Sequence, residues 1–404
     1  MTKPLLVYVH IPFCMSKCHF CDWVTEIPTA DLLLKERDAG RISYVDALCR
    51  QIRRRGAELV EQGYRPAIHY WGGGTASILT LDEIRRIGAA LHEVFDLSEL
   101  VEATIECSPE TLTPEKLAVF RDIGFFRMSS GVQSFDDRRL RKLGRSHTAE
   151  LAVQAFNMAS DAGFEDLNLD LMCGFPGEDL NEIEHSVTEA LSLPVTHVAL
   201  YPFRPAHGTV MRRQMARGDS HILREEQKRA YRLGQQMLIS AGFPEYAMSH
   251  FGTLRCHSDL AYFRLEMDWV GFGSGAGSLL AGEFSTTARG QLPAFNRDPF
   301  ALAERHPVAS GAVAPRLLYQ SLTTFEGALE ANWLERSGRP LDEILRLPPV
   351  RHLTSFLDAA GGLEHTPEGL RLPRDRISDA FIDLQFASAP KQGKRAVGAQ
   401  AKFG

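Results

Sequence analysis

The chain has 404 residues, of which 44% are hydrophobic and 24% are charged, and its formal net charge is −6. This composition is ordinary for a globular protein, and the length favours one large α/β unit with a smaller appendage. An acidic chain gives no reason to expect non-specific nucleic-acid binding, and no apolar run is long enough to indicate a membrane span. The N-terminal apolar segment, broken by His10 and Pro12, is a poor signal peptide. We therefore expect a cytoplasmic protein whose clustered cysteines bind metal or take part in catalysis.

Apolar, β-rich runs alternate with longer helical patterns through the first half of the chain. The predicted strands are 5–11, 68–71, 101–107, 127–134, 166–173 and 197–203. The predicted helices are 44–60, 81–95, one opened by Pro114, two that follow Asp136 and Thr148, and one that ends at Leu191. Repeated strand–helix units of this length predict a parallel sheet with right-handed crossovers, closed or partly closed as a barrel.

The pattern changes after Arg224. A helix to about residue 239 leads into YAMSHFG (246–252) and then into the glycine-dense run GFGSGAG. That run lacks the glycine spacing G-x-G-x-x-G of a dinucleotide-binding loop. We therefore interpret it as a segment that packs closely around an active site. Beyond residue 298 the pattern is helical with a late Pro-Glu-Gly turn, which looks like a small winged-helix unit. The predicted domains are 1–225 (barrel core), 226–297 (barrel-completing extension), 298–388 (small, mostly helical domain) and 389–404 (disordered tail).

The stretch YVHIPFCMSKCHFCDW (8–23) places Cys14, Cys18 and Cys21 in one short loop after the first strand. A zinc site usually has four protein ligands in two separated pairs, so His19 or His10 would have to complete one here. An iron–sulfur cluster normally takes four thiolates. Three thiolates in one loop leave one iron open to a ligand that is not protein, as catalytic metal sites keep a position for substrate. The spacing favours such a cluster, with zinc and a chance grouping of thiols as the alternatives.

This loop and the motifs after it resemble the radical S-adenosylmethionine (SAM) superfamily. WGGGTAS (71–77), IECSPE, GVQSF, LGRSH and NLDLMCGFPGE follow in the order found in oxygen-independent coproporphyrinogen oxidases and their relatives. The resemblance runs from the first strand through the GFGSGAG run, and the C-terminal part is similar to that branch's small helical domain. It implies an α/β fold, a partial (β/α)6 TIM-like barrel, in which the three cysteines hold a 4Fe–4S cluster whose open iron chelates SAM. An electron from the cluster cleaves SAM into methionine and a 5′-deoxyadenosyl radical.

The resemblance also implies which residues contact the cofactors. Gly73, Gly74 and Thr75 follow a strand, and glycines there let backbone groups approach a ligand; in relatives this stretch contacts the methionyl amine of SAM. The remaining SAM contacts carried over are Glu106, Gln133, Arg145 and Asp170. An arginine offers a bidentate fork to a carboxylate, and an aspartate accepts ribose hydroxyls. By the same resemblance Tyr8 lies beside the cluster and Phe20 covers it.

Three functions share this scaffold: oxidative decarboxylation of coproporphyrinogen, haem chaperoning, and radical methylation of sp2 carbons. The oxidases carry a fourth cysteine where this chain has Trp23. The haem chaperones carry His-Asn-x-x-Tyr-Trp where this chain has SDLAYF (258–263), although the adjacent Cys256 and His257 offer haem ligands. These departures lead us to predict a methyltransferase or methylene transferase that acts on a secondary-metabolite precursor, by methylation or cyclopropanation, in the manner of antibiotic biosynthesis. Haem chaperoning, decarboxylation and a cofactor carrier without enzymatic activity stay open.

That prediction requires two SAM molecules, one for the radical and one for the transferred carbon. Met172 and the turn YPFRPAHGT (201–209) stand where relatives place the second SAM or the substrate. Tyr201, Cys173 and His207 are the candidates for moving a proton after addition, since a base must lie within hydrogen-bond reach of its target. The family's usual electron donor is a flavodoxin or ferredoxin. We expect no membrane partner, and we expect the winged-helix-like segment to form a lid or partner surface rather than bind nucleic acid.

Overall fold

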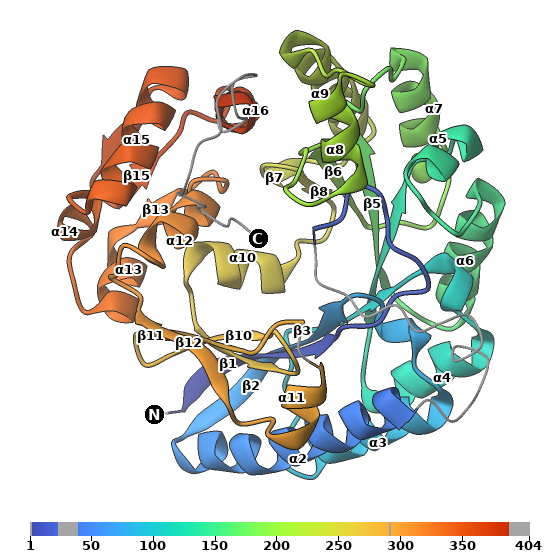
Figure 1. Ribbon diagram of the computed structural model, residues 1–404, viewed down its shortest axis with the longest axis vertical. Helices are drawn as coiled ribbons and strands as arrows, with labels where there is room; N and C mark the ends of the chain where they lie inside the picture. Colours follow the sequence, from blue (N-terminus) through green and yellow to red (C-terminus); the bar gives the residue numbers. More distant parts are fainter. Residues whose placement is uncertain (1, 23–38, 291, 388–404) are drawn as a thin grey trace.

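The computed structural model describes residues 2–22, 39–290 and 292–387. One curved sheet of twelve strands dominates it, in the order β12-β11-β10-β9-β1-β2-β3-β4-β5-β6-β8-β7 (Figure 1). Six consecutive parallel strands form its centre: β1 (Lys3–Ile11), β2 (Tyr64–Gly73), β3 (Glu102–Cys107), β4 (Arg127–Gln133), β5 (Asp166–Cys173) and β6 (His197–Pro202). The predicted α/β partial barrel of six parallel strands is confirmed.

Helices between these strands cover the outer face of the sheet. They are α2 (Ala39–Glu61), α3 (Leu81–His92), α4 (Pro114–Ile123), α5 (Asp137–Lys142), α6 (Ala149–Asp161) and α7 (Leu180–Leu191), with short 3-10 turns η1 (Ala76–Ile78) and η2 (Pro109–Thr111). Thr80 and Asp179 form capping boxes at the starts of α3 and α7, and Pro114 occupies the first turn of α4, where a missing N–H is harmless. The helices therefore begin where the sequence places its capping residues.

Side chains on each central strand alternate between the outer core and the barrel interior. On β5, Leu167, Leu169 and Leu171 are buried in the hydrophobic core that the sheet shares with the outer helices. Asn168 and Asp170, at the positions between them, are hydrogen-bonded to each other. Because side chains alternate along a strand, the polar residues of the barrel strands point inward.

The second half of the chain closes the open side of the barrel. β7 (Glu245–Ala247) and β8 (His250–Gly252) extend the sheet beyond β6, and β9 (Asp268–Phe272) pairs with β1 at the other side. The antiparallel strands β10 (Gly277–Leu280), β11 (Glu283–Thr287) and β12 (Leu302–Pro307) follow β9. Helix α10 (His257–Arg264) lies between the two sides of the sheet (Figure 1). Its residue Ala261 shares a buried cluster with Leu6 and Ile68 of the inner barrel wall.

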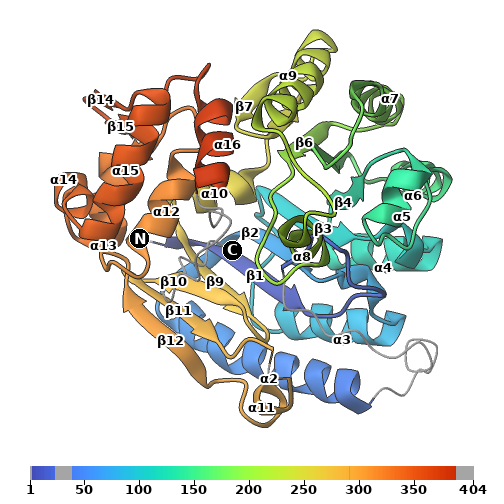
Figure 2. The ribbon, with the colours of Figure 1, turned by 45° about the horizontal axis from the view of Figure 1, so that its top comes forward.

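The C-terminal portion is mostly helical, as predicted, and gathers beside α10 and β9–β12 (Figure 2). The remaining helices are α8 (Val210–Arg217), α9 (Arg224–Ser240), α11 (Leu292–Arg297), α12 (Ala314–Ser321), α13 (Glu330–Ser337), α14 (Leu341–Leu345), α15 (Pro348–Gly361) and α16 (Ile377–Ala387). A small antiparallel sheet joins β13 (Ala328–Leu329), β15 (Gly369–Arg371) and β14 (Glu364–Thr366). The portion after residue 298 begins with strand β12 rather than a helix, because this segment pairs with β11. The domain boundaries stay predictions, and the predicted tail 389–404 lies outside the described residues.

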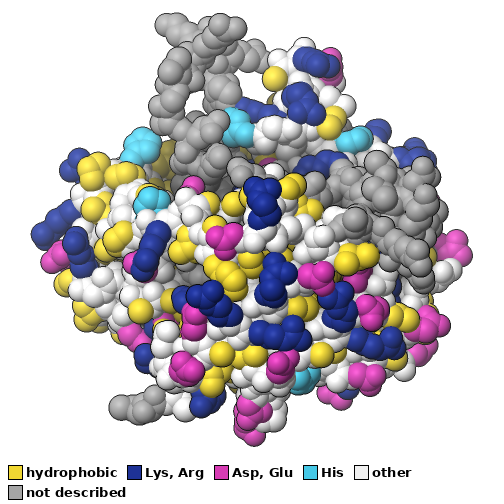
Figure 3. All heavy atoms as spheres, turned by 60° about the horizontal axis from the view of Figure 1, so that its bottom comes forward, with side chains coloured by type: hydrophobic (Ala, Val, Ile, Leu, Met, Phe, Trp, Pro, Cys, Tyr) yellow, Lys and Arg dark blue, Asp and Glu magenta, His cyan; other side chains and the backbone are white. Residues whose placement is uncertain are grey.

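The face at the bottom of Figure 1, where α2, α3 and α11 lie, carries both signs of charge close together (Figure 3). Arg53 pairs with Glu93 at 2.6 Å, and Arg54 pairs with Glu58 at 3.4 Å. Interspersed charges of this kind are usual for a solvated surface. Among the helices that the structure describes, none is both long and apolar enough to cross a membrane.

Candidate functional site

The cysteine loop follows β1 and is anchored to three other elements. Gly74 N donates to Ile11 O at 2.8 Å where the loop begins. Within the loop, His19 N donates to Leu143 O at 2.8 Å, and Met211 N donates to His19 O at 3.0 Å. Cys14, Cys18 and Cys21 are half-buried, and none of the seven cysteines forms a disulfide. The loop therefore presents its three thiols at the carboxyl ends of the barrel strands, where barrel enzymes keep their active sites.

The zinc alternative fits this loop poorly. The two histidines that could complete a zinc site have other contacts: His10 Nδ1 lies 3.0 Å from the Tyr8 hydroxyl, and His19 Nδ1 lies 2.8 Å from Lys142 O. Within the described ranges, no three His, Cys, Asp or Glu side chains converge on a point that a single ion could occupy. A zinc ion needs its ligands about 2.0–2.3 Å from one point, whereas cluster thiolates bind separate irons. The thiols suit an iron–sulfur cluster better than zinc.

Two of the predicted SAM contacts lie against the thiols. Arg145 Nη1 donates to Cys18 Sγ at 3.3 Å and Nη2 donates to Gly131 O at 2.5 Å, while its buried Nε has no hydrogen-bond partner among the described residues. Thr75 Oγ1 donates to Cys14 Sγ at 3.8 Å. A buried donor without a hydrogen-bond partner suits an anionic ligand. These residues fit a cluster with a bound carboxylate.

Close packing explains Gly73, the last residue of β2, and Gly74, which follows it. A Cβ at Gly74 would lie 2.5 Å from Phe13 O and 3.0 Å from Cys14 Sγ. Gly73 has φ near +114°, and a Cβ there would lie 2.5 Å from the ring of His10. Any larger residue would push the cysteine loop away from the barrel end, so this turn requires glycine.

Glu106 ends β3 and faces the barrel interior beside these glycines. Its Oε1 accepts a hydrogen bond from the Tyr70 hydroxyl at 2.5 Å, and its Oε2 accepts one from Gly73 N at 3.0 Å. Burial raises the pKa of Glu106 to about 7, although the two hydrogen bonds lower it. The sequence reasoning missed Tyr70. Its position two residues before Gly72, on the same face of β2, is the signal that could have found it.

The next two strands bring Gln133 and Asp170 to the same end of the barrel. Gln133 ends β4 with φ near +74°, a left-handed conformation that costs of order 1–3 kcal/mol in a non-glycine residue and is common at functional sites. Asp170 Oδ1 accepts a hydrogen bond from Asn168 Nδ2 at 2.8 Å. Burial raises the pKa of Asp170 to about 6, while that hydrogen bond and the charge of Arg127 lower it. The predicted SAM contacts therefore come from β2, β3, β4 and β5 at one end of the sheet.

Phe20 and Met172 meet beside the cysteine loop. Both pack against a small hydrophobic cluster whose buried members are Leu143, Phe175, Phe203 and Met211. An apolar wall here excludes water from the space next to the thiols, which strengthens electrostatic interactions inside the site. Tyr8 lies nearby on β1, with its ring centroid 5.9 Å from that of Tyr70.

The three candidates for proton transfer are not brought together. Tyr201 faces the barrel interior and is 37% exposed. Cys173 is fully buried in the outer core, and burial raises the pKa of its thiol well above the usual value. His207 is exposed in the loop between β6 and α8. Of these three residues only Tyr201 lines the interior, and its role stays a prediction.

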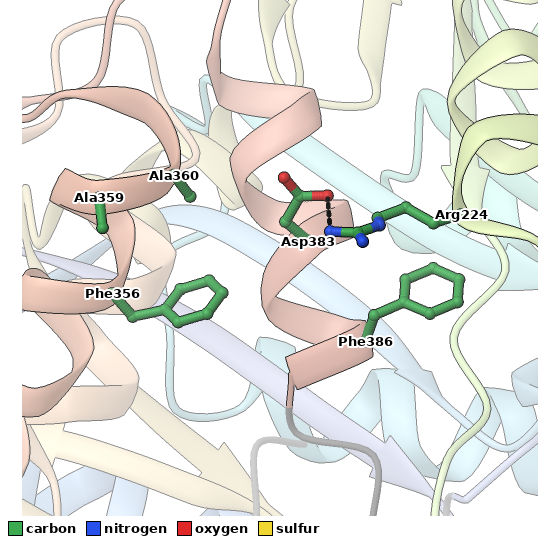
Figure 4. A pocket seen from close by; sticks show the side chains of 6 residues that line it. All are labelled: Arg224, Phe356, Ala359, Ala360, Asp383 and Phe386. Carbon is green, nitrogen blue, oxygen red and sulfur yellow. Dashed lines mark hydrogen bonds and ion pairs between the residues drawn. The ribbon is translucent and has the colours of Figure 1, made fainter. Parts of the chain in front are cut away.

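A separate pocket of about 370 Å³ lies between α9, α15 and α16 (Figure 4). Its lining residues are Arg224, Phe356, Ala359, Ala360, Asp383 and Phe386. The ion pair from Arg224 Nη1 to Asp383 Oδ1, at 3.5 Å, links α9 to α16 across it. None of the predicted site residues lines this pocket, so it is not the site of the cluster chemistry.

The model of the family described as the radical SAM superfamily matches residues 8–190. The heme chaperone HemW of Bacillus subtilis is 28% identical over 342 residues, which are 83% of this chain and 87% of that protein. HemW of Mycobacterium tuberculosis is 32% identical over 286 residues, 68% of this chain and 69% of that protein. The oxygen-independent coproporphyrinogen III oxidase of Paracoccus denitrificans is 26% identical over 414 residues, 95% of this chain and 87% of that protein. Among solved structures, coproporphyrinogen III oxidase (HemN) from Escherichia coli has the same fold, with a TM-score of 0.74 and 20% identity over 96% of this chain and 91% of that chain.

These similarities correct the functional prediction. Transfer of a methyl or methylene unit to a secondary-metabolite precursor, and with it the methyltransferase, cyclopropanation and antibiotic-biosynthesis assignments, is wrong, because the relatives are named haem chaperones and a porphyrinogen oxidase. The prediction depended on residues that this chain lacks, Trp23 replacing a cysteine and Ser258 replacing a histidine. Trp23 itself lies outside the described residues.

Proposed function

We propose that this chain binds haem and acts as a haem chaperone of the HemW type. The premise is that the chain belongs to the radical SAM superfamily and to its HemN/HemW-like branch. The observation that carries the proposal is the similarity to HemW proteins, which reaches 32% identity across more than two thirds of both chains. The cofactors of the superfamily are a 4Fe–4S cluster and SAM. A second SAM molecule stays a prediction.

The residues at the barrel end have the chemistry to hold these cofactors. Cys14, Cys18 and Cys21 would bind three irons of the cluster, which supplies the electron for SAM cleavage when it is present. The carboxylate of Glu106 would accept the methionyl ammonium, and Arg145 would donate to the methionyl carboxylate. A bound cation lowers the pKa of a neighbouring buried carboxyl, so SAM binding would favour the ionised form of Glu106.

Side chains of the barrel interior are accessible to a ligand. Tyr201 and the side chain of Asp259 are each 37% exposed there. Cys256, which the sequence suggested as a haem ligand, is 1% exposed, and its Sγ contacts Ser258 Oγ at 3.2 Å and Glu102 Oε1 at 3.9 Å. Burial raises the pKa of this thiol well above its usual value, which disfavours the thiolate form that binds iron. A haem ligand is therefore better sought among imidazoles than at Cys256.

The test is an anaerobic titration of the cluster-reconstituted protein with haem, followed by absorption spectroscopy. The proposal expects saturable binding of one haem per chain, with a Soret band that differs from that of free haem. A cluster-containing radical SAM protein from another branch serves as the control for non-specific uptake. Linear, unsaturable uptake equal to that of the control would refute haem chaperoning.

A second candidate is oxidative decarboxylation of coproporphyrinogen III. The match to the Paracoccus denitrificans oxidase, which spans 95% of this chain, favours it. Trp23, at the position where the resemblance gives the porphyrinogen oxidases a fourth cysteine, speaks against it. Incubation with coproporphyrinogen III, SAM and dithionite separates the two functions, since a decarboxylase releases carbon dioxide and a chaperone does not.

A further inference from the structure

His250, on β8, lies in the barrel wall with its imidazole unsatisfied. The residue is 3% exposed, and its buried Nδ1 has no hydrogen-bond partner among the described residues. The nearest carboxylate is that of Asp259 on α10, whose Oδ2 lies 3.6 Å from Nδ1. A buried polar atom left without a hydrogen bond costs roughly 1–3 kcal/mol, so such an atom in a folded protein calls for an explanation.

The surroundings of His250 point toward the barrel interior. β8 pairs with β6 so that His250 stands opposite Ala199, between the inward-facing His197 and Tyr201. The His250 ring is 6.0 Å from the ring of Tyr201 and 5.6 Å from that of Phe263. Because Tyr201 and Asp259 are both more than a third exposed, His250 lies directly beneath the open interior surface.

We propose that His250 is the axial ligand of the haem iron and that Asp259 orients its imidazole. The inference rests on the proposed haem function and names the residue that would hold the ligand. A histidine that binds a metal nearly always donates its other ring N–H to a carboxylate or carbonyl, which fixes the tautomer and leaves the opposite nitrogen for the metal. Donation from Nδ1 to Asp259 requires the 3.6 Å separation to shorten by a few tenths of an ångström, and it leaves Nε2 for iron.

The charges around His250 favour the neutral imidazole that metals bind. Burial lowers the pKa of His250, the charge of Asp259 on α10 raises it, and the charge of Arg127 on β4 lowers it. The carboxylate of Asp259 would also offset part of the positive charge of a ferric haem. A neutral ring with one nitrogen committed to a carboxylate is the form that serves as a proximal haem ligand.

Two other histidines near α10 are less suitable. His197 uses both ring nitrogens, Nδ1 with Asn168 Oδ1 at 2.5 Å and Nε2 with the Tyr246 hydroxyl at 2.7 Å. His257 is exposed at the start of α10, and its backbone N–H donates to Glu102 Oε2 at 2.5 Å. Ser258, at the position where the chaperones carry histidine, is buried. His250 combines a nearby carboxylate, uncommitted ring nitrogens and a position at the interior wall.

The experiment compares haem binding by the cluster-reconstituted wild type with that of five variants. His250→Ala and His250→Gln should weaken haem binding at least tenfold and remove the absorption features of a histidine-ligated haem. Asp259→Asn should weaken binding by a few fold. His257→Ala, the matched control, should bind haem like the wild type. In His250→Gly, added imidazole should restore the histidine-type spectrum, which a purely structural role for His250 would not produce.

Iron content and SAM binding show whether each variant is folded, and His250→Gln keeps the site filled if the alanine variant does not fold. If the wild type binds haem and His250→Gln binds it with the same affinity and spectrum, His250 is not the ligand, while the proposed function stands. Loss of the histidine-type spectrum in His257→Ala instead would assign the ligand to α10. If the wild type takes up no haem, the proposed function and this inference both fail.

Discussion

Two glutamates on the same strand, Glu102 and Glu106, face the same barrel interior and have opposite roles. Glu102, at the start of β3, is 1% exposed and accepts hydrogen bonds from Thr104 Oγ1 at 2.8 Å and from the backbone of α10. Glu106 lies four residues further along β3 on the same face. It accepts hydrogen bonds from the Tyr70 hydroxyl and from Gly73 N, and burial raises its pKa to about 7. The first carboxylate anchors α10 inside the barrel, whereas we predict that the second receives the ammonium group of SAM.

The same contrast extends around the barrel. At the amino ends of the strands, which we call the barrel base, polar side chains are hydrogen-bonded within the protein: Thr104 with Glu102 at 2.8 Å, and Asn168 with His197 at 2.5 Å. At the carboxyl ends, the barrel mouth, Gln133 adopts a strained backbone and Asp170 has a raised pKa. Polar groups whose bonds are complete stabilise a fold, and incomplete ones at strand ends indicate where a ligand binds.

The largest expected difference between the barrel mouth and the barrel base concerns their cysteines. Cys18→Ser at the mouth should abolish cluster assembly, because two thiolates and a hydroxyl are a poor ligand set for a 4Fe–4S cluster. Cys256→Ser at the base should leave the cluster in place. Iron and sulfide analysis with electron paramagnetic resonance after reduction checks both. Equal cluster content in the two variants would contradict the assignment of Cys18.

Glu102→Gln should lower the free energy of unfolding by about 2 kcal/mol at pH 7. The variant places an amide N–H₂ group beside the backbone N–H groups of His257 and Ser258, so a buried hydrogen bond is lost. Glu106→Gln should not lower stability at this pH, since it removes a carboxyl whose ionisation burial opposes. Denaturant unfolding of the apoprotein measures both values. A larger loss for Glu106→Gln than for Glu102→Gln would reverse the two roles.

The raised pKa of Glu106 predicts two pH dependences of opposite sign. The folded state keeps the Glu106 proton up to about pH 7, whereas the unfolded state loses it near its usual value, so this residue makes stability fall as pH rises between those values. SAM binding should instead tighten through the same range, because the ionised carboxylate attracts the ammonium. Calorimetric titration from pH 5.5 to 7.5 measures the affinity. Glu106→Gln should remove the contribution of this residue to both slopes, and an unchanged pair of slopes would contradict it.

The smallest expected effect concerns two tyrosines on β2 that bond to carboxylates. Tyr70→Phe removes the donor to Glu106 and should move the midpoint of the SAM-binding pH profile upward, because that hydrogen bond lowers the pKa of Glu106. Tyr64→Phe removes an equivalent bond to Asp268, 2.5 Å long, near the amino end of the same strand, and should leave the midpoint in place. A shift of the same size in both variants would show that Tyr70 acts only through general stability.

The sequence predicts the parallel core closely because each strand carries its own pattern. β5 begins at Asp166 and ends at Cys173 in both the prediction and the structure. Helix α2 begins at Ala39, five residues before the predicted start, since Gly40 in its first turn is a poor helix former. The short strands β10–β12 were missed because four- to six-residue antiparallel strands around glycines have little periodicity of their own.

The candidate site also has a part that could be predicted from the sequence and a part that could not. The three cysteines lie close to one another in the chain, and so do the glycines at 72–74. Each of these two groups could therefore be predicted from the sequence. The alternation of β5 could also have placed Met172 inward and Cys173 outward. His250 with Asp259 could not be predicted in this way, because this pair joins β8 to α10 and depends on how α10 enters the barrel.

The most direct test of the account is the position of iron in a crystal of the protein reconstituted with its cluster and saturated with haem. Anomalous diffraction at the iron edge should show a compact group of irons beside Cys14, Cys18 and Cys21. A separate single iron should lie within the barrel interior, next to His250. A single iron outside the barrel, or none after saturation with haem, would contradict the proposed haem site.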